Sequence, residues 1–128
     1  MAKPILHKDN ILLVDDEIIT LKITRKVLME HGYNVDIASS SSEAMNLLGN
    51  STYQLVIVDI TMPSISGFDL IQLMQSFDYN VPVIFLSNSD NDWTIEESYN
   101  VGAKRFVSKE KEFNYLPSIV KEVLATVS

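Results

Sequence analysis

The sequence predicts an α/β protein with a doubly wound parallel sheet, in which helices cover both faces. Two observations lead to this prediction. Short apolar runs alternate five times with stretches of helical character, an order typical of parallel strands joined by right-handed helical crossovers. Most of these runs are apolar at every position, as in strands buried on both faces. The length of 128 residues suits one domain with one core.

The expected strands are short, and each is bounded by polar residues. In chain order they are Ile11–Val14, Val35–Ala38, Leu55–Val58, Val83–Leu86 and the weaker Phe106–Val107. The second run alternates apolar and polar residues. We therefore expect it nearer an edge of the sheet, where one face of the strand is less covered.

A helix is expected after each strand. The first follows Asp16 and stops at Gly32, a favoured C-terminal residue. The second begins with the capping-box pair Ser40 and Glu43 and ends at Gly49. The remaining helices are expected at 67–77, at 92–101 and at about 116–127, where Pro117 is tolerated in the first turn.

Charge and composition exclude several functions. Ten Lys and Arg against 17 Asp and Glu give a net charge of −7, so we expect no binding to nucleic acid or to a membrane surface. The absence of cysteine excludes disulfides and thiolate chemistry and suits the cytoplasm, the expected location. No apolar run approaches the roughly 18 residues of a membrane span. Residues 1–9 are expected to be a loose lead-in to a domain at 10–128.

Charged and polar residues follow the apolar runs where the strands end. Asp15 and Asp16 follow the first run, Asp59 the third, Ser87 the fourth and Lys109 the fifth. In an open parallel sheet the carboxyl ends of the strands meet at one edge, and ligands bind there. We therefore expect these five side chains to surround one site.

The residue types at this edge favour one kind of chemistry. Three neighbouring carboxylates repel one another unless a cation lies among them. Oxygen ligands favour a hard ion, Mg²⁺ before Zn²⁺. A hydroxyl and an ammonium on the opposite side could bind the oxygens of a transferred phosphoryl group. The pattern therefore indicates phosphoryl transfer to a carboxylate.

With these residues identified, the sequence resembles the receiver domain of two-component response regulators from about residue 10 to residue 127. The motifs are Leu12-Leu13-Val14-Asp15-Asp16-Glu17, Val58-Asp59-Ile60-Thr61-Met62-Pro63 with Gly67, Phe85-Leu86-Ser87, Gly102-Ala103 and Phe106-Val107-Ser108-Lys109. Each motif alone is weak, but together and in this order they are highly specific. The resemblance implies a flavodoxin-like (βα)5 fold with five parallel strands in the order 2-1-3-4-5.

The resemblance also implies an acceptor and a metal site. Asp59 would take the phosphoryl group from a histidine of a sensor kinase or a phosphotransfer protein. Asp16 and Asp59 would bind Mg²⁺ through their side chains, Asp15 through a bridging water and Thr61 through its backbone carbonyl. The chain would then be a signalling switch that catalyses its own phosphorylation, without a separate substrate.

Further residues would transmit the change. By resemblance, Ser87 and Lys109 would bind the phosphoryl oxygens, and the ring of Phe106 would follow Ser87. The rearrangement would reach the surface formed by the fourth helix, the fifth strand and the fifth helix. A downstream effector or a second copy of the chain would bind this surface.

Three positions depart from the family pattern. Asn88 stands where a small residue is usual and could narrow the path to the site. Glu110 replaces the proline that normally follows Lys109 through a cis bond. Because a cis bond without proline costs about 3–4 kcal/mol, we expect a trans bond and a shifted loop that displaces Lys109. Ser66 replaces an acidic residue far from the chemistry, where we expect little effect.

Two other functions remain open. Asn88 and Glu110 favour an atypical receiver that acts as a phosphorylation-independent interaction module. A small flavin- or nucleotide-binding enzyme on the same fold lacks support, since the sequence has no G-x-G-x-x-G or Walker A motif. Trp93, the single tryptophan, either anchors a partner or packs against a loop.

Each site residue also has a purely structural interpretation. Asp15 and Asp16 fit helix caps, and Ser87 fits a turn hydroxyl. Lys109 fits a solvated loop, and Phe106 fits a core aromatic as well as a switch. Their order and spacing along the chain favour the functional interpretation.

Overall fold

The computed structural model describes residues 9–62 and 65–126, so most of the expected lead-in, Pro63 and Val127 lie outside the described residues. Five parallel strands form one sheet in the order β2-β1-β3-β4-β5, which confirms the predicted fold class. The strands are β1 (Asn10–Val14), β2 (Asn34–Ala38), β3 (Leu55–Val58), β4 (Val83–Ser87) and β5 (Arg105–Ser108). The alternating strand, β2, lies at an edge as predicted.

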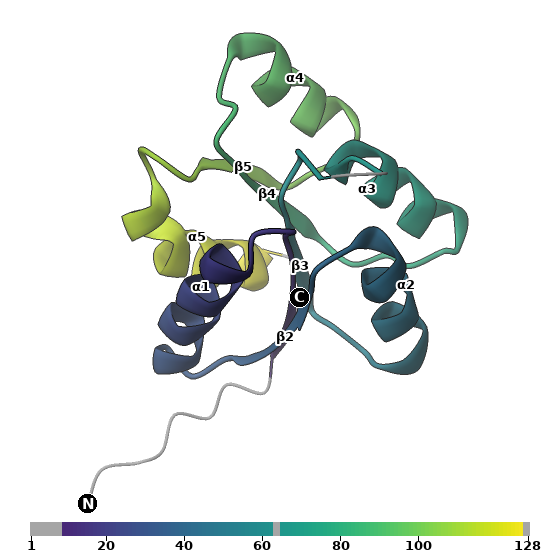
Figure 1. Cartoon of the computed structure of the whole chain (residues 1–128), viewed down its shortest axis with the longest axis horizontal. Coiled ribbons are helices and arrows are strands. Elements are labelled where there is room, and N and C mark those ends of the chain that lie inside the picture. Colours follow the sequence, from purple (N-terminus) through teal and green to yellow (C-terminus); the bar gives the residue numbers. More distant parts are fainter. Residues whose placement is uncertain (1–8, 63–64, 127–128) are drawn as a thin grey trace, which may run out of the picture.

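Helices cover both faces of the sheet. They are α1 (Ile18–Glu30), α2 (Ser41–Asn50), α3 (Gly67–Ser76), α4 (Asp92–Asn100) and α5 (Leu116–Thr126), with a 3-10 turn, η1 (Phe113–Tyr115), before α5. Figure 1 shows α1 and α5 on one face, and α2, α3 and α4 on the other. Within the described residues, no helix combines the length and apolar character needed to span a bilayer.

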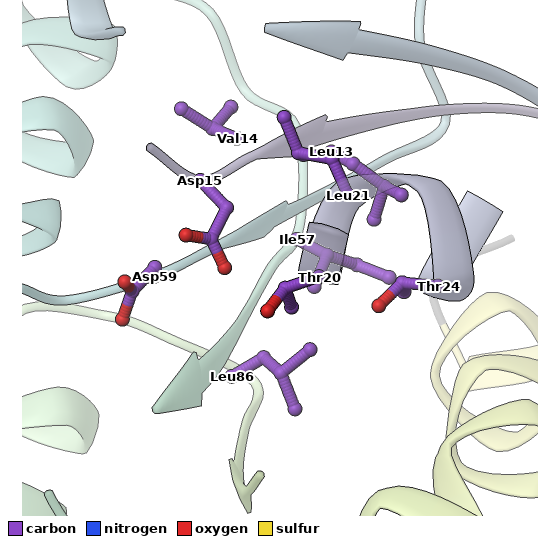
Figure 2. A pocket seen from close by; sticks show the side chains of 9 residues that line it. All are labelled: Leu13, Val14, Asp15, Thr20, Leu21, Thr24, Ile57, Asp59 and Leu86. Carbon is purple, nitrogen blue, oxygen red and sulfur yellow. The ribbon is translucent and has the colours of Figure 1, made fainter. Parts of the chain in front are cut away.

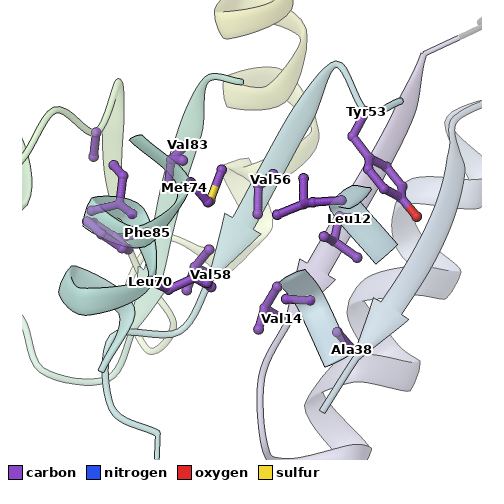
Figure 3. Packing of buried hydrophobic residues seen from close by; sticks show 14 of the residues in the cluster. Leu12, Val14, Ala38, Tyr53, Val56, Val58, Leu70, Met74, Val83 and Phe85 are labelled. Carbon is purple, nitrogen blue, oxygen red and sulfur yellow. The ribbon is translucent and has the colours of Figure 1, made fainter. Parts of the chain in front are cut away.

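The sheet separates two hydrophobic cores. Leu12 and Val14 of β1 belong to the core under α2 and α3, together with Phe85 of β4 (Figure 3). Ile11 and Leu13 belong to the core under α1 and α5. Successive strand residues point to opposite faces, so only strands that are apolar at every position can fill both cores. Each fully buried side chain of this size contributes roughly 1.5–3 kcal/mol.

Side-chain caps fix where α2, α3 and α4 begin, and in α4 the side chain of Asn91 accepts from the N–H of Thr94 at 2.8 Å. The hydroxyl of Ser40 accepts a hydrogen bond from the backbone N–H of Glu43 at 3.1 Å, as the capping-box spacing predicts. Ser66 does the same for α3, accepting from the N–H of Asp69 at 3.2 Å. The residue that departs from the family pattern at this position is therefore the N-cap of α3.

Candidate functional site

Three carboxylates meet at the carboxyl end of the sheet. Asp15 follows β1 and Asp59 follows β3, and the N–H of Asp59 donates to the carbonyl of Val14 at 2.9 Å. Both side chains are buried, whereas Asp16 is exposed. One oxygen from each carboxylate lies within 4.8 Å of the others. The sheet register therefore brings together the acidic residues that the sequence predicted to meet.

A buried lysine lies against these carboxylates. The Nζ of Lys109 is 2.7 Å from Oδ2 of Asp15 and 3.5 Å from Oδ2 of Asp59. It also lies 3.3 Å from Oε1 of Glu17, and only 8% of its side chain is exposed. Lys109 is the single cation that approaches within 4 Å of these carboxylates in the described part of the chain.

The predicted displacement of Lys109 is wrong. The bond to Glu110 is trans as expected, since the described residues contain no cis peptide bond. The parallel ladder nevertheless continues past β5, because the N–H of Lys109 donates to the carbonyl of Ser87 at 2.9 Å. This backbone bond fixes where the lysine leaves the strand, so its position does not depend on the residue that follows.

Burial and charge shift the ionisation of this cluster. The pKa of Asp59 is raised to about 6, mainly by burial and also by the charge of Asp15, while Lys109 opposes the rise. Burial also pulls the pKa of Lys109 down, but its hydrogen bond to Asp15 and the charges of Asp59 and Asp15 leave that pKa raised. The site thus holds more negative charge than one ammonium balances.

Asp59 lies at an open depression of about 510 Å³. Asp16, Thr61, Asn88 and Ser89 are among the residues that line it. The backbone N–H of Thr61 donates to Oδ1 of Asp59 at 3.3 Å and so orients the carboxylate. Solvent and small molecules therefore have a path to this side chain.

Ser87 ends β4 and makes no hydrogen bond to the carboxylates among the described residues. Its side chain is buried, and its Oγ accepts a hydrogen bond from the N–H of Ser89 at 3.1 Å. The oxygen only accepts in this turn, so the hydroxyl keeps its own proton and can donate it to a group carried by Asp59. The sequence predicted where Ser87 lies but not which way its hydroxyl points.

Phe106 is buried in the core under α2 and α3. Its backbone N–H donates to the hydroxyl of Tyr99 at 3.1 Å, so a tyrosine of α4 binds the free edge of β5. Tyr99 could not be predicted from the sequence, because apolar spacing on a helix carries no signal for a bond to a strand edge. The switch role of Phe106 stays a prediction.

A polar bridge joins the two loops that follow β4 and β5. The Nζ of Lys111 is 3.0 Å from Oδ2 of Asp90, and the hydroxyl of Ser108 donates to the same oxygen at 3.4 Å. The hydrogen bond to Lys111 lowers the pKa of Asp90. This bridge could not be predicted from the sequence, because the charged run around Lys109 fits a solvated loop equally well.

The backbone around Asp59 leaves no room for a side chain at Gly67. A Cβ there would lie 2.7 Å from the carbonyl oxygen of Asp59 and 2.9 Å from the Cα of Ile60. The N–H of Gly67 donates to the carbonyl of Ile60 at 2.8 Å. Glycine therefore lets α3 begin against the loop that carries the acidic residue.

A small, partly open space lies beside the carboxylates, under α1. Figure 2 shows Asp15 and Asp59 on one side of it and Thr20 and Thr24 of α1 on the other. The space measures about 10 Å³, room for one water at most. The hydroxyl of Thr24 is buried and has no hydrogen-bond partner among the described residues.

Comparisons with known proteins agree with this arrangement. Residues 11–121 match the family described as the response regulator receiver domain. The response regulator Rre1 of Synechocystis is 32% identical over 128 residues, covering 98% of this chain and 54% of that protein. The probable transcriptional regulator ycf29 of Porphyra purpurea is 32% identical over 117 residues, covering 90% of this chain and 56% of that protein. The chain spans about half the length of these relatives.

Solved structures show the same fold. The response regulator TrrA of Thermotoga maritima, in complex with Mg²⁺-BeF, has a TM-score of 0.79 and 30% identity, covering 90% of this chain and 98% of that one. A CheY-like receiver protein of Methanospirillum hungatei has a TM-score of 0.84 and 26% identity, covering 92% and 94%. The chain therefore belongs to the receiver domains of two-component response regulators, and it carries their acidic cluster at the carboxyl end of the sheet.

Proposed function

We propose that this receiver accepts a phosphoryl group on Asp59 from a phosphohistidine of a sensor kinase or a phosphotransfer protein. One observation carries the proposal: a buried carboxylate lies at an open depression and has an ammonium 3.5 Å away. The opening admits the donor, and the ammonium offsets the charge that transfer brings to the site. The chain acts as a switch with no separate substrate.

Phosphoryl transfer to Asp59 forms one bond to phosphorus and breaks another. An oxygen of ionised Asp59 attacks phosphorus, and the bond between phosphorus and the donor imidazole breaks as the new oxygen–phosphorus bond forms. The electron pair of the broken bond returns to the imidazole ring. Lys109 binds one phosphoryl oxygen, and the hydroxyl of Ser87 donates to another.

The residues around Asp59 fit a magnesium ion. Asp16 and Asp59 would hold it through their carboxylates, Asp15 through a water and Thr61 through its carbonyl. Hard oxygen donors and a local excess of negative charge favour this ion. When bound, Mg²⁺ supplies positive charge to the phosphoryl oxygens. The solved complex of TrrA with Mg²⁺-BeF supports the choice.

The exposed surface of α1 is where the phosphodonor would dock. Ile18, Ile19 and Ile23 are 52%, 70% and 51% exposed, an unusual concentration of aliphatic side chains on one helix. A shallow groove that Ile23, Asn88 and Lys109 help to line leads from this helix to the site. A donor helix on α1 would bring its histidine to the opening.

The other partners follow from family membership. Receiver domains generally interact with histidine kinases and effector domains, and we place this chain among them in the cytoplasm. An effector, or a second copy of the chain, would bind the surface of α4, β5 and α5. Tyr99 and Phe106 lie on the route from Ser87 to this surface.

Phosphorylation by a small donor tests the proposal. The chain is incubated with acetyl phosphate or phosphoramidate and Mg²⁺, and its intact mass is measured. We expect wild type and the surface control Asp92→Asn to gain one phosphoryl group. Asp59→Asn and wild type in chelator should gain none.

Each contrary result has a clear meaning. Uptake by Asp59→Asn would remove Asp59 from the acceptor role. Folded wild type that takes up no phosphate from either donor would favour the phosphorylation-independent interaction module, the alternative that Asn88 and Glu110 raised. Circular dichroism of every variant separates loss of uptake from loss of fold.

A further inference from the structure

The single tryptophan of the chain is both exposed and rigidly held. Trp93 lies in the first turn of α4 and is 67% exposed. Its ring packs edge-on against Phe68 of α3, with ring centroids 6.0 Å apart. Phe68 packs in the same way on Phe85 of β4 at 5.4 Å. The exposed ring is therefore anchored to the core through a second aromatic residue rather than packed against a loop.

Trp93 marks a surface that differs from the face of α4, β5 and α5. Tyr99, on the same helix, points to β5, where its hydroxyl binds the backbone of Phe106. Trp93 points the other way, towards Phe68 of α3. We call the surface around Trp93 and Phe68 the α3–α4 seam. A large, ordered and exposed aromatic of this kind is typical of a binding hot spot, since little side-chain entropy remains to be lost.

The helices around the seam carry one sign of charge. Helices α2, α3 and α4 contain five acidic residues and no Lys or Arg, a net charge of −5: Glu43, Asp69, Asp92, Glu96 and Glu97. Helices α1 and α5, on the other face, contain four basic and two acidic residues, a net charge of +2: Lys22, Arg25, Lys26, Lys121, Glu30 and Glu122. The seam lies in the negative layer.

The charges on α4 lie beside the tryptophan. Glu96 and Glu97 follow Trp93 by three and four residues, so all three share one side of the helix. Asp92 precedes it. An aromatic anchor with carboxylates around it complements an apolar side chain flanked by basic residues, because opposite potentials steer the encounter and fix its register.

We propose that the α3–α4 seam binds a segment of a partner protein that presents an apolar side chain between Lys or Arg residues. The apolar side chain packs on Trp93 and Phe68, and the basic residues face Glu96 and Glu97. This interaction goes beyond the proposed phosphoryl transfer and does not depend on it. Only this layer of the molecule combines an exposed tryptophan with unopposed negative charge among the described helices.

Selection from a random peptide library tests the chemistry of the occupant. Peptides displayed on phage are selected on the folded wild-type chain and counter-selected on Trp93→Ala. We expect recovered peptides to combine an aliphatic or aromatic residue with flanking Lys or Arg. Recovery of acidic peptides, or no enrichment over the counter-selection, would overturn the proposal.

A recovered peptide is then titrated against purified variants by fluorescence anisotropy. Trp93→Ala should weaken binding about tenfold or more. The double variant Glu96→Lys, Glu97→Lys should weaken it several-fold in low salt and less in high salt. Phe77→Ala, which removes another exposed aromatic, should change nothing. Equal affinity for all four proteins would contradict the assignment. Trp93 emission of wild type gives an independent readout, since no other tryptophan contributes.

A second copy of the chain is the competing occupant, because α1 is also apolar and basic. Sedimentation velocity of the chain alone distinguishes the two. We expect one species whose mass does not change with concentration. Self-association that is lost in Trp93→Ala and also in Lys22→Glu, Lys26→Glu would assign the seam to a second copy and overturn the partner segment. Asp59→Asn should bind the recovered peptide like wild type, so failure of the proposed phosphorylation leaves this test intact.

Discussion

The two ends of the sheet differ in charge: charged side chains gather at the carboxyl end, and neutral groups pair at the amino end. At the carboxyl end, Asp15 and Asp59 are buried side by side with one lysine between them. At the amino end, neutral groups pair: the N–H of Asn10 donates to Oε1 of Gln54 at 2.6 Å, and the N–H of Gln54 donates to the carbonyl of Asn10 at 2.9 Å. One end holds repelling charges, and the other holds satisfied hydrogen bonds.

This difference places the groups that lower stability at the carboxyl end of the strands, where the candidate site lies, and the groups that do not at the amino end. Buried like charges cost free energy of folding, whereas paired neutral groups do not. A protein keeps such a cost where the charges are used. If the comparison is right, removing a carboxylate at the carboxyl end should stabilise the chain. Removing Lys109 should destabilise it, because the lysine offsets the charge of the carboxylates. Removing a polar partner near the amino end should destabilise it.

The largest expected effect comes from Lys109→Ala. The substitution leaves Asp15 and Asp59 buried without their cation, so we expect the free energy of unfolding to fall by about 3 kcal/mol. Urea denaturation in chelator measures it, with exposed Lys104→Ala as the control. The loss should shrink when Mg²⁺ is added, since a metal ion replaces the missing charge.

Magnesium binding by the same variant sharpens the assignment. In our scheme Lys109 binds the phosphoryl group and not the metal, so Lys109→Ala should keep its affinity for Mg²⁺ or bind more tightly. Titration followed by Trp93 emission reports it. A large loss of metal affinity would contradict the role given to this lysine.

Asp59→Asn should stabilise the chain in a pH-dependent way. The pKa of Asp59 is raised from 3.8 to about 6, so the folded state holds a proton that the unfolded state has lost between these values. Wild type therefore loses stability as pH rises through this window, and the cost is complete above about pH 6. We expect the variant to gain about 2 kcal/mol at pH 8 and almost nothing at pH 4.

Paired denaturation curves of wild type and Asp59→Asn across this pH range, in chelator, isolate the contribution of Asp59. Only their difference matters, since every other carboxylate titrates in both proteins. A gain that is the same at pH 4 and pH 8 would mean that the asparagine acts by packing and not by removing charge.

The sequence could predict this cluster because strand order and strand ends are encoded locally. Asp15 and Asp59 directly follow apolar runs, and parallel pairing brings such positions to one edge. Lys109 reached the same edge for the same reason. The prediction that the loop at Glu110 displaces Lys109 was wrong, because the backbone hydrogen bond between Lys109 and Ser87 holds the end of β5 in place.

The directions of individual side chains could not be predicted from the sequence. Ser87 has one position but several rotamers, and the N–H of Ser89 selects the one seen here. The bridge from Asp90 to Lys111 and the bond from Phe106 to Tyr99 join residues of different elements and loops. Such pairings depend on how loops and helices pack, and no periodicity records them.

Tyr53→Phe should have the opposite sign to Asp59→Asn. Just ahead of β3, the hydroxyl of Tyr53 donates to Oδ2 of Asp36 at 2.6 Å. Losing this bond to a charged acceptor should cost about 1.5 kcal/mol. Burial, followed by the hydrogen bond to Asp36, raises the pKa of Tyr53 to about 12, so the phenol stays neutral and the cost should not change between pH 6 and pH 8. Thermal unfolding at both pH values measures it, and a gain in stability would break the comparison.

Thr24→Val should have the smallest effect, and like Asp59→Asn it should raise the free energy of unfolding. The Thr24 hydroxyl is buried beside the space behind Asp15 without a hydrogen-bond partner among the described residues, so a methyl group of the same shape removes an unpaired polar atom. We expect a gain of about 0.5–1 kcal/mol in urea denaturation. Thr20→Val, whose hydroxyl donates to Glu17 at 3.2 Å, is the matched control and should not gain. A loss in Thr24→Val would show that the hydroxyl is paired, with a water in that space as its partner. The carboxyl end would then be penalised by its charges alone.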